Sequence, residues 1–313
     1  MNLDKKFQNL FLEVVNKAAI SSFSFVGKEN KVAADKAAVD AMRKSLNKIE
    51  MKGQVVIGEG ELDKAPMLYI GENLGLMKGP ELDIAVDPLE GTNFAAKNLP
   101  GALSVIAVAN KNNLFNAPET YMNKISADIS ETGVIDLDYS VKKNIHNLAD
   151  YKNKKLENIT ACILDRPRHK EIIDKLKDLG VKLKLITDGD VSGALLVTDI
   201  KYDVDIFLGI GGGPEGVLAA CALDAYNCKF QGRFIFETEN DKKRASKMGI
   251  TDFNKKYELN EIISGDSIFC ATGITSGDLV SGIKKEKDGF CTETLITHKS
   301  CGLKKVIKNR IRI

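Results

Sequence analysis

The chain of 313 residues carries 45 lysines and arginines against 43 aspartates and glutamates, so its formal net charge is only +2. No basic stripe points to nucleic acid, and no apolar stretch reaches the length of a membrane span, so we expect neither partner. Hydrophobic residues make up 43% of the chain, which is enough for a core in one large domain or two smaller ones.

The six cysteines include no CxxC pair, and several lie in apolar runs such as residues 267–272. This pattern favours buried, reduced thiols over a disulfide framework or a zinc site. Residues 1–7 include an acid and an amide and lack a long apolar core, so we expect no signal peptide. The sequence therefore predicts a cytosolic enzyme.

Hydrophobic residues at helical spacing predict one helix over residues 6–25 and a second over about 31–50. In the second helix, Asp35 lies four residues before Val39 and seven before Met42, which places it on the inward face. A lone carboxylate is costly to desolvate there. Asp35 therefore needs a partner, and either a metal ion or a buried arginine would serve.

A strand predicted over residues 54–57 leads directly into a loop that contains Glu59, Glu61 and Asp63. Such runs of acidic residues usually form exposed, charged loops. In α/β sheets, however, ligand groups collect at the ends of strands. We therefore keep these three carboxylates as candidates for a functional site.

The segment DIAVDPLEGT (83–92) predicts a short strand that ends at Pro88, because proline has no amide hydrogen to donate. Asp87 and Glu90 lie on either side of this proline, and after a glycine that allows a bend, Thr92 adds a hydroxyl. Hard oxygen ligands of this kind suit a divalent metal ion. Taken alone, the segment is explained equally well as an acidic surface turn.

The second half of the chain alternates strands and helices. A strand is expected at 103–109, followed by a polar, loop-like region to about residue 154. Beyond it we expect strands at 159–164, 181–186 and 204–208, and helices near 170–179, from 191 and from 214. This alternation predicts an α/β half. A charged run at 152–157 indicates a weak boundary, so we expect halves 1–155 and 156–313 packed as one compact unit.

Polar groups follow the first two of these later strands. Arg166 and Arg168 follow the first, where two guanidinium groups could bind phosphate oxygens, although a solvated turn explains them equally well. Asp188 and Asp190 follow the second, where they suit sugar hydroxyls or a helix N-cap. For Asp190 taken alone, the cap is the favoured interpretation.

A glycine-rich run, GIGGGPEG (209–216), follows the third of these strands. Pro214 suits the first turn of a helix, whose backbone amides can point at an anion. Glu215 is explained without a ligand by its favourable place near the positive end of the helix dipole. A dinucleotide loop is disfavoured because the run lies far from the start of the chain and ends in Pro-Glu.

The histidines suggest no catalytic arrangement. His169 is expected only to shape the turn after the two arginines, and His146 and His298 are expected at the surface because their surroundings are polar. No pairing of serine or cysteine with histidine emerges from the spacing.

Taken together, the ordered motifs resemble class II fructose-1,6-bisphosphatases of the bacterial GlpX type. In chain order they are KVAAD (31–35), GEGELDKAPMLY (58–69), DPLEGT (87–92), NAPETY (116–121), RPRH (166–169), DGD (188–190), GGGPEG (211–216), ATGITSGD (271–278) and TETL (292–295). The likeness covers nearly the whole chain. The DPLEGT motif also resembles the wider superfamily of metal-dependent, lithium-sensitive sugar phosphatases, which includes inositol monophosphatases.

The resemblance implies an α/β (α+β) fold, arranged as a layered α-β-α-β-α sandwich. It implies hydrolysis of the 1-phosphate of fructose 1,6-bisphosphate to fructose 6-phosphate and phosphate, a reaction of gluconeogenesis. The expected partner is a small sugar bisphosphate, and the expected cofactors are two or more Mn²⁺ or Mg²⁺ ions. A cytoplasmic homo-oligomer, either a dimer or a tetramer, is also implied.

The resemblance assigns metal ligands by motif position. Asp35 and Glu59 would hold one divalent ion. Asp87, Glu90 and Glu215 would hold a second. This set consists only of carboxylates, which suits hard cations.

The same resemblance assigns catalytic and substrate-binding roles. Thr92 would orient the attacking water, and Asp63 would accept its proton. Substrate contacts would come from Lys31, Glu90, Gly91, Thr92, Tyr121, Arg166, Pro167, Arg168, Asp188, Gly189, Asp190 and Gly212. Arg166 stands where other members of the family can carry lysine, which keeps the charge but changes the donor geometry.

Other functions stay open at this point. One alternative is an enzyme that also accepts sedoheptulose 1,7-bisphosphate, and another is an activity like that of inositol phosphatases. A non-enzymatic alternative is a nucleotide-binding regulatory protein that uses the glycine-rich run.

Overall fold

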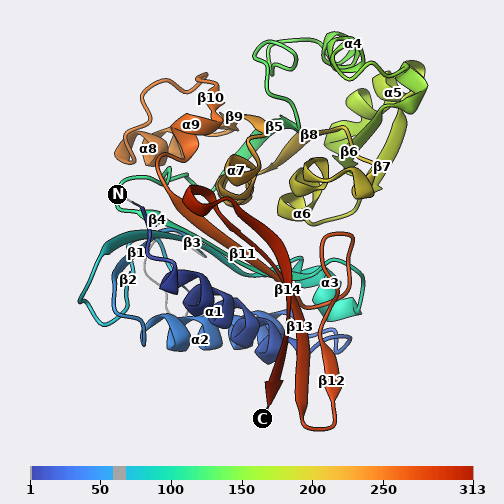
Figure 1. Cartoon of the computed structure of the whole chain (residues 1–313). Coiled ribbons are helices and arrows are strands. Elements are labelled where there is room, and N and C mark those ends of the chain that lie inside the picture. Colours follow the sequence, from blue (N-terminus) through green and yellow to red (C-terminus); the bar gives the residue numbers. More distant parts are fainter. Residues whose placement is uncertain (1, 59–67, 313) are drawn as a thin grey trace. The chain divides into compact units, whose positions relative to one another are not determined.

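The computed structural model describes residues 2–58 and 68–312 (Figure 1). They form two compact units, Met1–Asn116 with Ile263–Ile313 and Ala117–Ile262. Each unit has its own sheet and its own buried hydrophobic cluster. Residue 155, near which the sequence predicts a weak boundary, lies within the second unit.

The first unit is built on a mixed sheet with the strand order β12-β13-β11-β4-β3-β1-β2, and β14 pairs with β13. Strands β1 and β3 are parallel, whereas β3 and β4 are antiparallel. The strands are β1 (Lys52–Ile57), β2 (Asn73–Leu74), β3 (Glu81–Glu90), β4 (Leu103–Asn110), β11 (Ser267–Gly273), β12 (Lys284–Glu286), β13 (Gly289–His298) and β14 (Leu303–Arg312).

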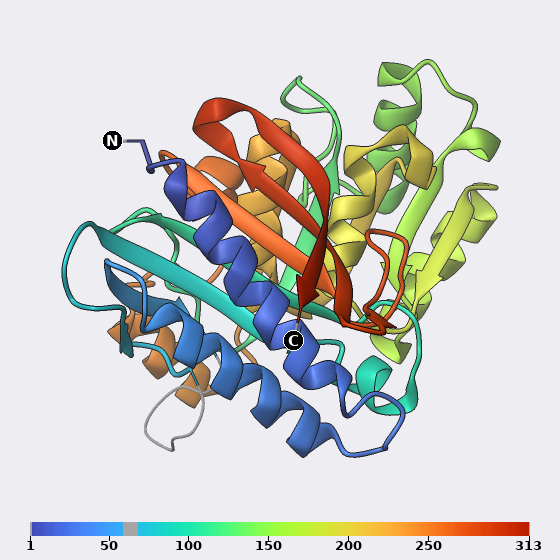
Figure 2. The ribbon, with the colours of Figure 1, turned by 60° about the horizontal axis from the view of Figure 1, so that its bottom comes forward.

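Two helices, α1 (Lys6–Phe23) and α2 (Lys31–Leu46), pack side by side against the first sheet (Figure 2). Both were predicted, and α1 buries the expected face, which includes Phe7 and Phe11. α2 begins after Asn30, whose side chain accepts a hydrogen bond from the Ala33 amide. It ends before the expected residue 50. A short helix, α3 (Thr92–Lys97), follows β3.

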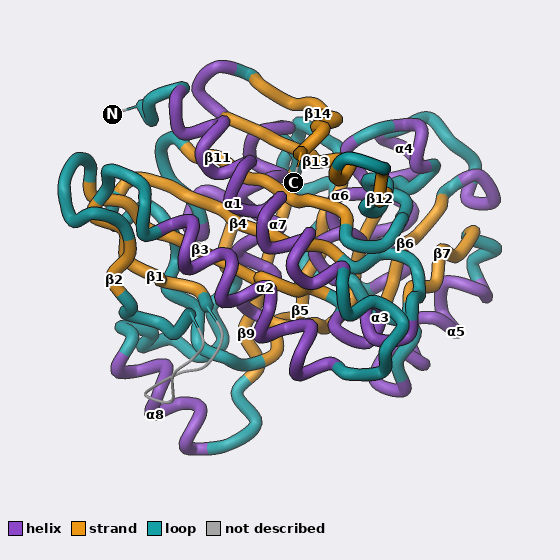
Figure 3. The backbone as a smooth tube through the Cα atoms, turned by 90° about the horizontal axis from the view of Figure 1, so that it is seen from below, coloured by secondary structure: helices purple, strands orange, loops and turns teal. Residues whose placement is uncertain are grey.

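The second unit contains a mixed sheet with the order β10-β9-β5-β8-β6-β7, in which β6 is parallel to β7 and β8. Its strands are β5 (Tyr121–Ala127), β6 (Thr160–Leu164), β7 (Lys182–Ile186), β8 (Ile206–Gly212), β9 (Lys229–Ile235) and β10 (Tyr257–Glu258). Its helices are α4 (Val141–Tyr151), α5 (Lys170–Asp178), α6 (Asp190–Leu195), α7 (Gly213–Tyr226), α8 (Glu239–Lys247) and α9 (Leu259–Ile262). Figure 3 shows α5 beside β7.

Short 3-10 helices complete the described secondary structure. They are η1 (Leu156–Asn158), η2 (Pro167–His169), η3 (Leu196–Thr198), η4 (Ile200–Tyr202) and η5 (Lys299–Cys301). Two mixed sheets with helices confirm the predicted mixed α/β class. No helix in the described ranges is both long and apolar enough to cross a membrane.

The prediction of a loop-like region before residue 154 is wrong in two places, because β5 and α4 lie there. In β5 the strand pattern is obscured by Lys124, a charged residue that points into the interior and is 1% exposed. In α4 the buried face is narrow, with Ile145 and Leu148 among mostly polar neighbours. Tertiary contacts therefore decide both elements more than local pattern does.

The cysteines and histidines follow their predictions only in part. The six cysteines, which all lie in the described residues, form no disulfide; four are buried, while Cys291 is half-buried and Cys301 is exposed. His146 is exposed as expected. His298 is not a surface residue: it is 0% exposed, and its Nε2 lies 2.9 Å from Oδ2 of Asp266. That buried carboxylate, far from His298 in sequence, explains why the polar surroundings misled the prediction.

Candidate functional site

Strand β3 carries the first group of candidate residues. The strand does not end at Pro88 but runs to Glu90, so that prediction is wrong. Between Asp87 and Glu90 the pairing with β4 shifts, and two residues of β3 lie opposite one of β4. This β-bulge lets the strand contain a proline that cannot donate to the ladder.

The turn after the bulge brings several oxygen groups into a short stretch of chain. Gly91 has a φ of 76°, in the left-handed region that glycine adopts without steric penalty, and α3 begins at Thr92. Glu90 is 4% exposed, and Asp87 is half-buried. The Leu89 amide donates to Oδ1 of Asp87 at 3.2 Å. Two carboxylates and one hydroxyl thus lie within residues 87–92.

Helix α2 carries two further candidates. Lys31 is its first residue and is exposed, and Asp35 lies one turn later and is half-buried between the buried Ala34 and Ala38. Helix α2 packs against both β3 and α3. Neighbouring elements of one unit therefore carry Asp35, Asp87, Glu90 and Thr92.

The chemistry of these donors fits a hard divalent cation. Glu59, Glu61 and Asp63 lie outside the described residues. Within residues 2–58 and 68–312, no group of three or more histidine, cysteine, aspartate or glutamate side chains is placed to hold a metal ion. The candidate donors described in the first unit are all carboxylate oxygens, the type that Mg²⁺ and Mn²⁺ prefer. These donors are therefore of the chemical type that suits the divalent ions implied by the family resemblance.

In the second unit, the turn after β6 carries Arg168 in a braced position. Its guanidinium donates from Nε and Nη2 to the carbonyl oxygen of Ile210, at 3.0 and 2.9 Å. The guanidinium carbon lies 4.8 Å from the ring centroid of Tyr121, which is 44% exposed. A guanidinium has five N–H donors, so three are left for a ligand. This bracing favours anion binding over a freely solvated turn.

His169 shapes this turn, as predicted. Its Nδ1 donates to the carbonyl oxygen of Leu164, and its Nε2 accepts from the amide of Ile210, each at 2.7 Å. Burial lowers the pKa of His169, which keeps the ring neutral, with one nitrogen donating and the other accepting. The side chain thereby ties the end of β6 to β8.

Asp190 is the first residue of α6, after Gly189 with a φ of 83°. Its side chain does not cap the helix, so the cap interpretation is wrong. Instead it forms a buried ion pair with Lys124, and Lys124 also donates to the carbonyl oxygen of Gly212 at 2.7 Å. Asp188, two residues earlier, is half-buried.

Glu215 lies in the first turn of α7, next to Pro214 in the predicted position. Its carboxylate folds back over Gly212, where an added Cβ would collide with Oε2. Burial raises the pKa of the Glu215 carboxyl, and the positive charge of Lys124 opposes that rise. Glu215 is therefore held close to the end of β8 and not simply exposed at a helix start.

Sequence reasoning missed Lys124, which no motif included. The available signal was a lysine between Met122 and Ile125, two apolar residues of β5 that are both buried. A lysine at such a position is either solvated or paired with a buried acid. Its partners lie 66 and 88 residues away, so the sequence could not identify them.

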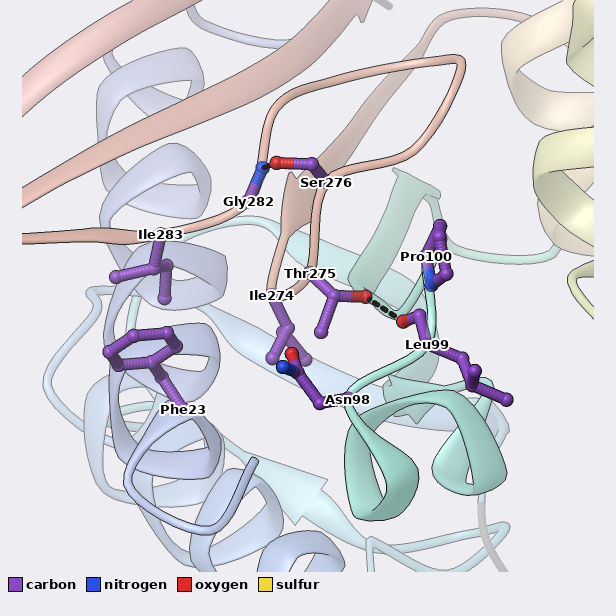
Figure 4. A pocket seen from close by; sticks show the side chains of 9 residues that line it. All are labelled: Phe23, Asn98, Leu99, Pro100, Ile274, Thr275, Ser276, Gly282 and Ile283. Carbon is purple, nitrogen blue, oxygen red and sulfur yellow. Dashed lines mark hydrogen bonds between the residues drawn. The ribbon is translucent and has the colours of Figure 1, made fainter. Parts of the chain in front are cut away.

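The first unit also contains a cavity of about 280 Å³ beside the end of α3 (Figure 4). Asn98 and Leu99 lie on one side, and Ile283 and Phe23 lie on the other. None of the candidate site residues that the structure describes lines it. The cavity is thus separate from the groups described above.

The sequence was compared with known families and proteins. A model of the family described as bacterial fructose-1,6-bisphosphatase, glpX-encoded, matches residues 5–311. A protein of Prochlorococcus marinus (strain AS9601), named D-fructose 1,6-bisphosphatase class 2/sedoheptulose 1,7-bisphosphatase, is 42% identical over 91% of this chain and 90% of its own length. A protein of the same name from Synechococcus sp. (strain JA-3-3Ab) is 39% identical over 94% of this chain and 92% of its own length.

Among solved structures, an inositol monophosphatase from Anabaena is 11% identical and covers 62% of this chain and 71% of its own. Its TM-score is 0.33. A likeness at this level adds nothing to the match with the family.

Proposed function

Because the chain belongs to the family of bacterial, glpX-encoded fructose-1,6-bisphosphatases, we propose that it hydrolyses the 1-phosphate of fructose 1,6-bisphosphate to fructose 6-phosphate and inorganic phosphate. The observation that carries this proposal is the match with the family over residues 5–311, which includes both units. The braced guanidinium of Arg168 supports it, since a sugar bisphosphate offers two phosphates to such a group.

We propose two or more Mg²⁺ or Mn²⁺ ions as cofactors. Asp35, Glu59, Asp87, Glu90 and Glu215 are the proposed ligands. When bound, such ions stabilise negative charge on phosphate oxygens and lower the pKa of coordinated water. The described donors support this choice because they are carboxylates on packed elements of the first unit and a carboxylate fixed at the start of α7.

The proposed chemistry is an attack of water on phosphorus. The hydroxyl of Thr92 orients the water, and Asp63 accepts its proton as the new phosphorus–oxygen bond forms. The bond between phosphorus and the C1 oxygen breaks, and the sugar leaves with its hydroxyl restored after protonation. Thr92 suits this role because the left-handed turn at Gly91 fixes the start of α3 beside two carboxylates.

The second unit supplies the proposed contacts to the rest of the substrate. Arg166 and Arg168 bind the phosphate that is not cleaved, and Asp188 and Asp190 accept hydrogen bonds from sugar hydroxyls. Oδ1 of Asp190 is buried without a hydrogen-bond partner, which supports a role as an acceptor. The remaining proposed contacts are Tyr121, Pro167, Gly189 and Gly212 in the second unit, and Lys31, Glu90, Gly91 and Thr92 in the first.

We also propose that the protein hydrolyses sedoheptulose 1,7-bisphosphate. The names of the Prochlorococcus and Synechococcus relatives, which are 42% and 39% identical to this chain, include that activity. Both substrates are ketose 1-phosphates with a second phosphate at the far end, so one arrangement of groups can orient either.

A phosphate-release assay tests both proposals. The purified protein is given fructose 1,6-bisphosphate, sedoheptulose 1,7-bisphosphate and inositol monophosphate in turn, with Mg²⁺, with Mn²⁺ or with a chelator. We expect release from the two bisphosphates, abolished by the chelator. A clear preference for inositol monophosphate, or tight nucleotide binding without any metal-dependent release, would contradict the main proposal.

The family resemblance also leads us to propose a cytoplasmic homo-oligomer, a dimer or a tetramer. Light scattering coupled to size-exclusion chromatography measures the mass in solution. A monomer across the concentrations used in the assay would contradict the oligomer.

A further inference from the structure

Lys124 is a buried cation in the middle of a sheet. It lies on β5, which pairs with β8 on one side and β9 on the other, and its side chain is 1% exposed. Transferring an ammonium group out of water costs free energy, and an ion pair with one acid seldom offsets that cost fully. A hydrophobic side chain at such a position costs less free energy. The lysine therefore requires an explanation beyond stability.

The contacts of Lys124 join the starts of two helices. Its Nζ bonds to Oδ2 of Asp190, the first residue of α6, and donates to the carbonyl oxygen of Gly212, which directly precedes α7. Gly216, in the first part of α7, lets that helix lie close, since an added Cβ would lie 3.2 Å from Cδ of Lys124. One side chain thus fixes Asp190 and the end of β8 together.

Only one of the two carboxylate oxygens of Asp190 takes part in the ion pair. Oδ2 bonds to Lys124, whereas Oδ1 is buried and has no hydrogen-bond partner. The whole residue is 8% exposed. Leaving a buried carboxylate oxygen without a hydrogen bond is unfavourable, because the oxygen has lost its contact with water. A ligand hydroxyl that donates to Oδ1 removes this penalty.

The local backbone is shaped around the same carboxylate. An added Cβ on Gly211 would collide with the Asp190 carboxylate, so only glycine leaves room for Asp190 at this place. Rotation of the Asp190 side chain is limited by the bond to Lys124 on one side and by β8 on the other. Oδ1 is therefore presented in a fixed direction.

We propose that Lys124 is a positioning residue, which fixes Asp190 so that Oδ1 accepts a hydrogen bond from a sugar hydroxyl of the substrate. This inference rests on the proposed sugar bisphosphatase function. Lys124 itself does not touch the substrate in this arrangement. Its effect reaches the substrate through Asp190 and through the carbonyl group of Gly212.

The test compares Lys124→Met with a matched lysine of the same unit. Lys256 also bonds to carboxylates, those of Asp136 and Asp138, and Lys256→Met serves as the control. We expect Lys124→Met to raise KM for fructose 1,6-bisphosphate by about 10–100-fold, as for the loss of a charged hydrogen bond. The same variant should bind fructose 6-phosphate correspondingly more weakly in calorimetry. Lys256→Met should leave both values unchanged.

A double-mutant cycle separates positioning from a merely structural role. If Lys124 acts through Asp190, adding Lys124→Met to Asp190→Asn raises KM little further, because the group that Lys124 positions is already impaired. Fully additive effects on KM would overturn the proposal. The control for folding is the circular dichroism spectrum and the unfolding temperature of each variant.

Two further outcomes keep the inference distinct from the proposed function. If the wild-type protein releases no phosphate from fructose 1,6-bisphosphate, the proposed function fails. If it does release phosphate and Lys124→Met keeps the wild-type KM, only the role of Lys124 is wrong. Should Lys124→Met not fold, Lys124→Gln is measured instead. Its side chain is too short to reach both partners, so an unchanged KM again overturns the proposal.

Discussion

The two units hold their candidate residues in different ways. In the first, Asp87, Glu90 and Thr92 lie along one strand end and the start of the next helix, placed by a bulge and a glycine turn. In the second, Asp190 begins α6, and Lys124 of β5 joins it to the carbonyl oxygen of Gly212, directly before the helix that carries Glu215. One unit uses the local course of its backbone, and the other uses a buried charge.

This difference indicates two kinds of sensitivity. A site built on local backbone depends on the residues that set the turn, so the relevant substitutions lie next to the functional groups. A site held by a buried charge depends on residues distant in sequence. Among the proposed roles, Thr92 of the first unit acts on water, whereas Arg168 and Asp190 of the second unit orient the substrate. Four predictions test this division, in decreasing order of expected effect.

The largest effect is expected from Thr92→Ala. Without the hydroxyl that is proposed to orient water, kcat should fall by about 10²–10⁴-fold. Mn²⁺ affinity, measured by electron paramagnetic resonance, should change little, because Thr92 is not a proposed ligand. Thr92→Ser keeps a hydroxyl and should recover much of the rate. If Thr92→Ala keeps most of the wild-type kcat, Thr92 does not orient the attacking water.

Arg168→Lys should raise KM for fructose 1,6-bisphosphate by about tenfold or more, equivalent to about 1.4 kcal/mol. An ammonium cannot both reproduce the two bonds to Ile210 and present a planar set of donors. Arg166→Lys is the matched control, and the family resemblance, which implies that lysine is tolerated at that position, predicts a smaller effect. Equal values of KM for the two variants would contradict a special role of Arg168.

Gly91→Ala should lower the free energy of unfolding by about 1–2 kcal/mol, because alanine is strained at a φ of 76°. It should also lower kcat, since the new methyl group would lie 3.0 Å from Cδ2 of Phe94 and shift the start of α3. Gly180→Ala, at a φ of 72° with no neighbour within 4 Å, is the control. It should lose similar stability in urea unfolding and keep the wild-type kcat. If both variants keep that kcat, the turn does not position Thr92.

The smallest effect concerns pH. The folded protein lowers the pKa of His169, so the unfolded chain binds that proton first as the pH falls below about 6.5. The stability that the neutral ring provides is then lost, by at most about 1.4 kcal/mol per pH unit, until the pH reaches the folded pKa. Urea unfolding between pH 8 and pH 5 measures this slope.

Two histidine variants serve as the comparison for that slope. His169→Gln should unfold with a weaker dependence on pH, whereas His146→Gln, at an exposed position, should behave as the wild type. Identical slopes for all three proteins would show that His169 does not hold its turn as a neutral ring.

Much of the fold was predictable because it depends on local pattern. The alternation after residue 158, the early helices and Pro214 in the first turn of α7 follow from spacing and from the chemistry of single residues. The continuation of β3 past Pro88 was not predictable, because the bulge is defined only by the pairing of β3 with β4. β5 was missed for a related reason, since its lysine is buried only through distant partners.

The candidate site was predictable to a different extent in each unit. Contiguous motifs pointed to Asp87, Glu90 and Thr92 without any knowledge of packing. For Asp190, the local interpretation as a cap was wrong, because its actual partner lies 66 residues away. A residue such as Lys124, which belongs to no motif, becomes visible only when the sheet is assembled.

The division of the chain into two units has a consequence for the order in which they can fold during synthesis. The second unit is synthesised between two parts of the first, and Leu114 and Ile263, close to the two crossing points, pair in an isolated bridge. A ribosome therefore releases all of Ala117–Ile262 before it supplies β11, β13 and β14. During translation the second unit can close first, while the first unit keeps β4 as an uncovered edge until the last strands emerge.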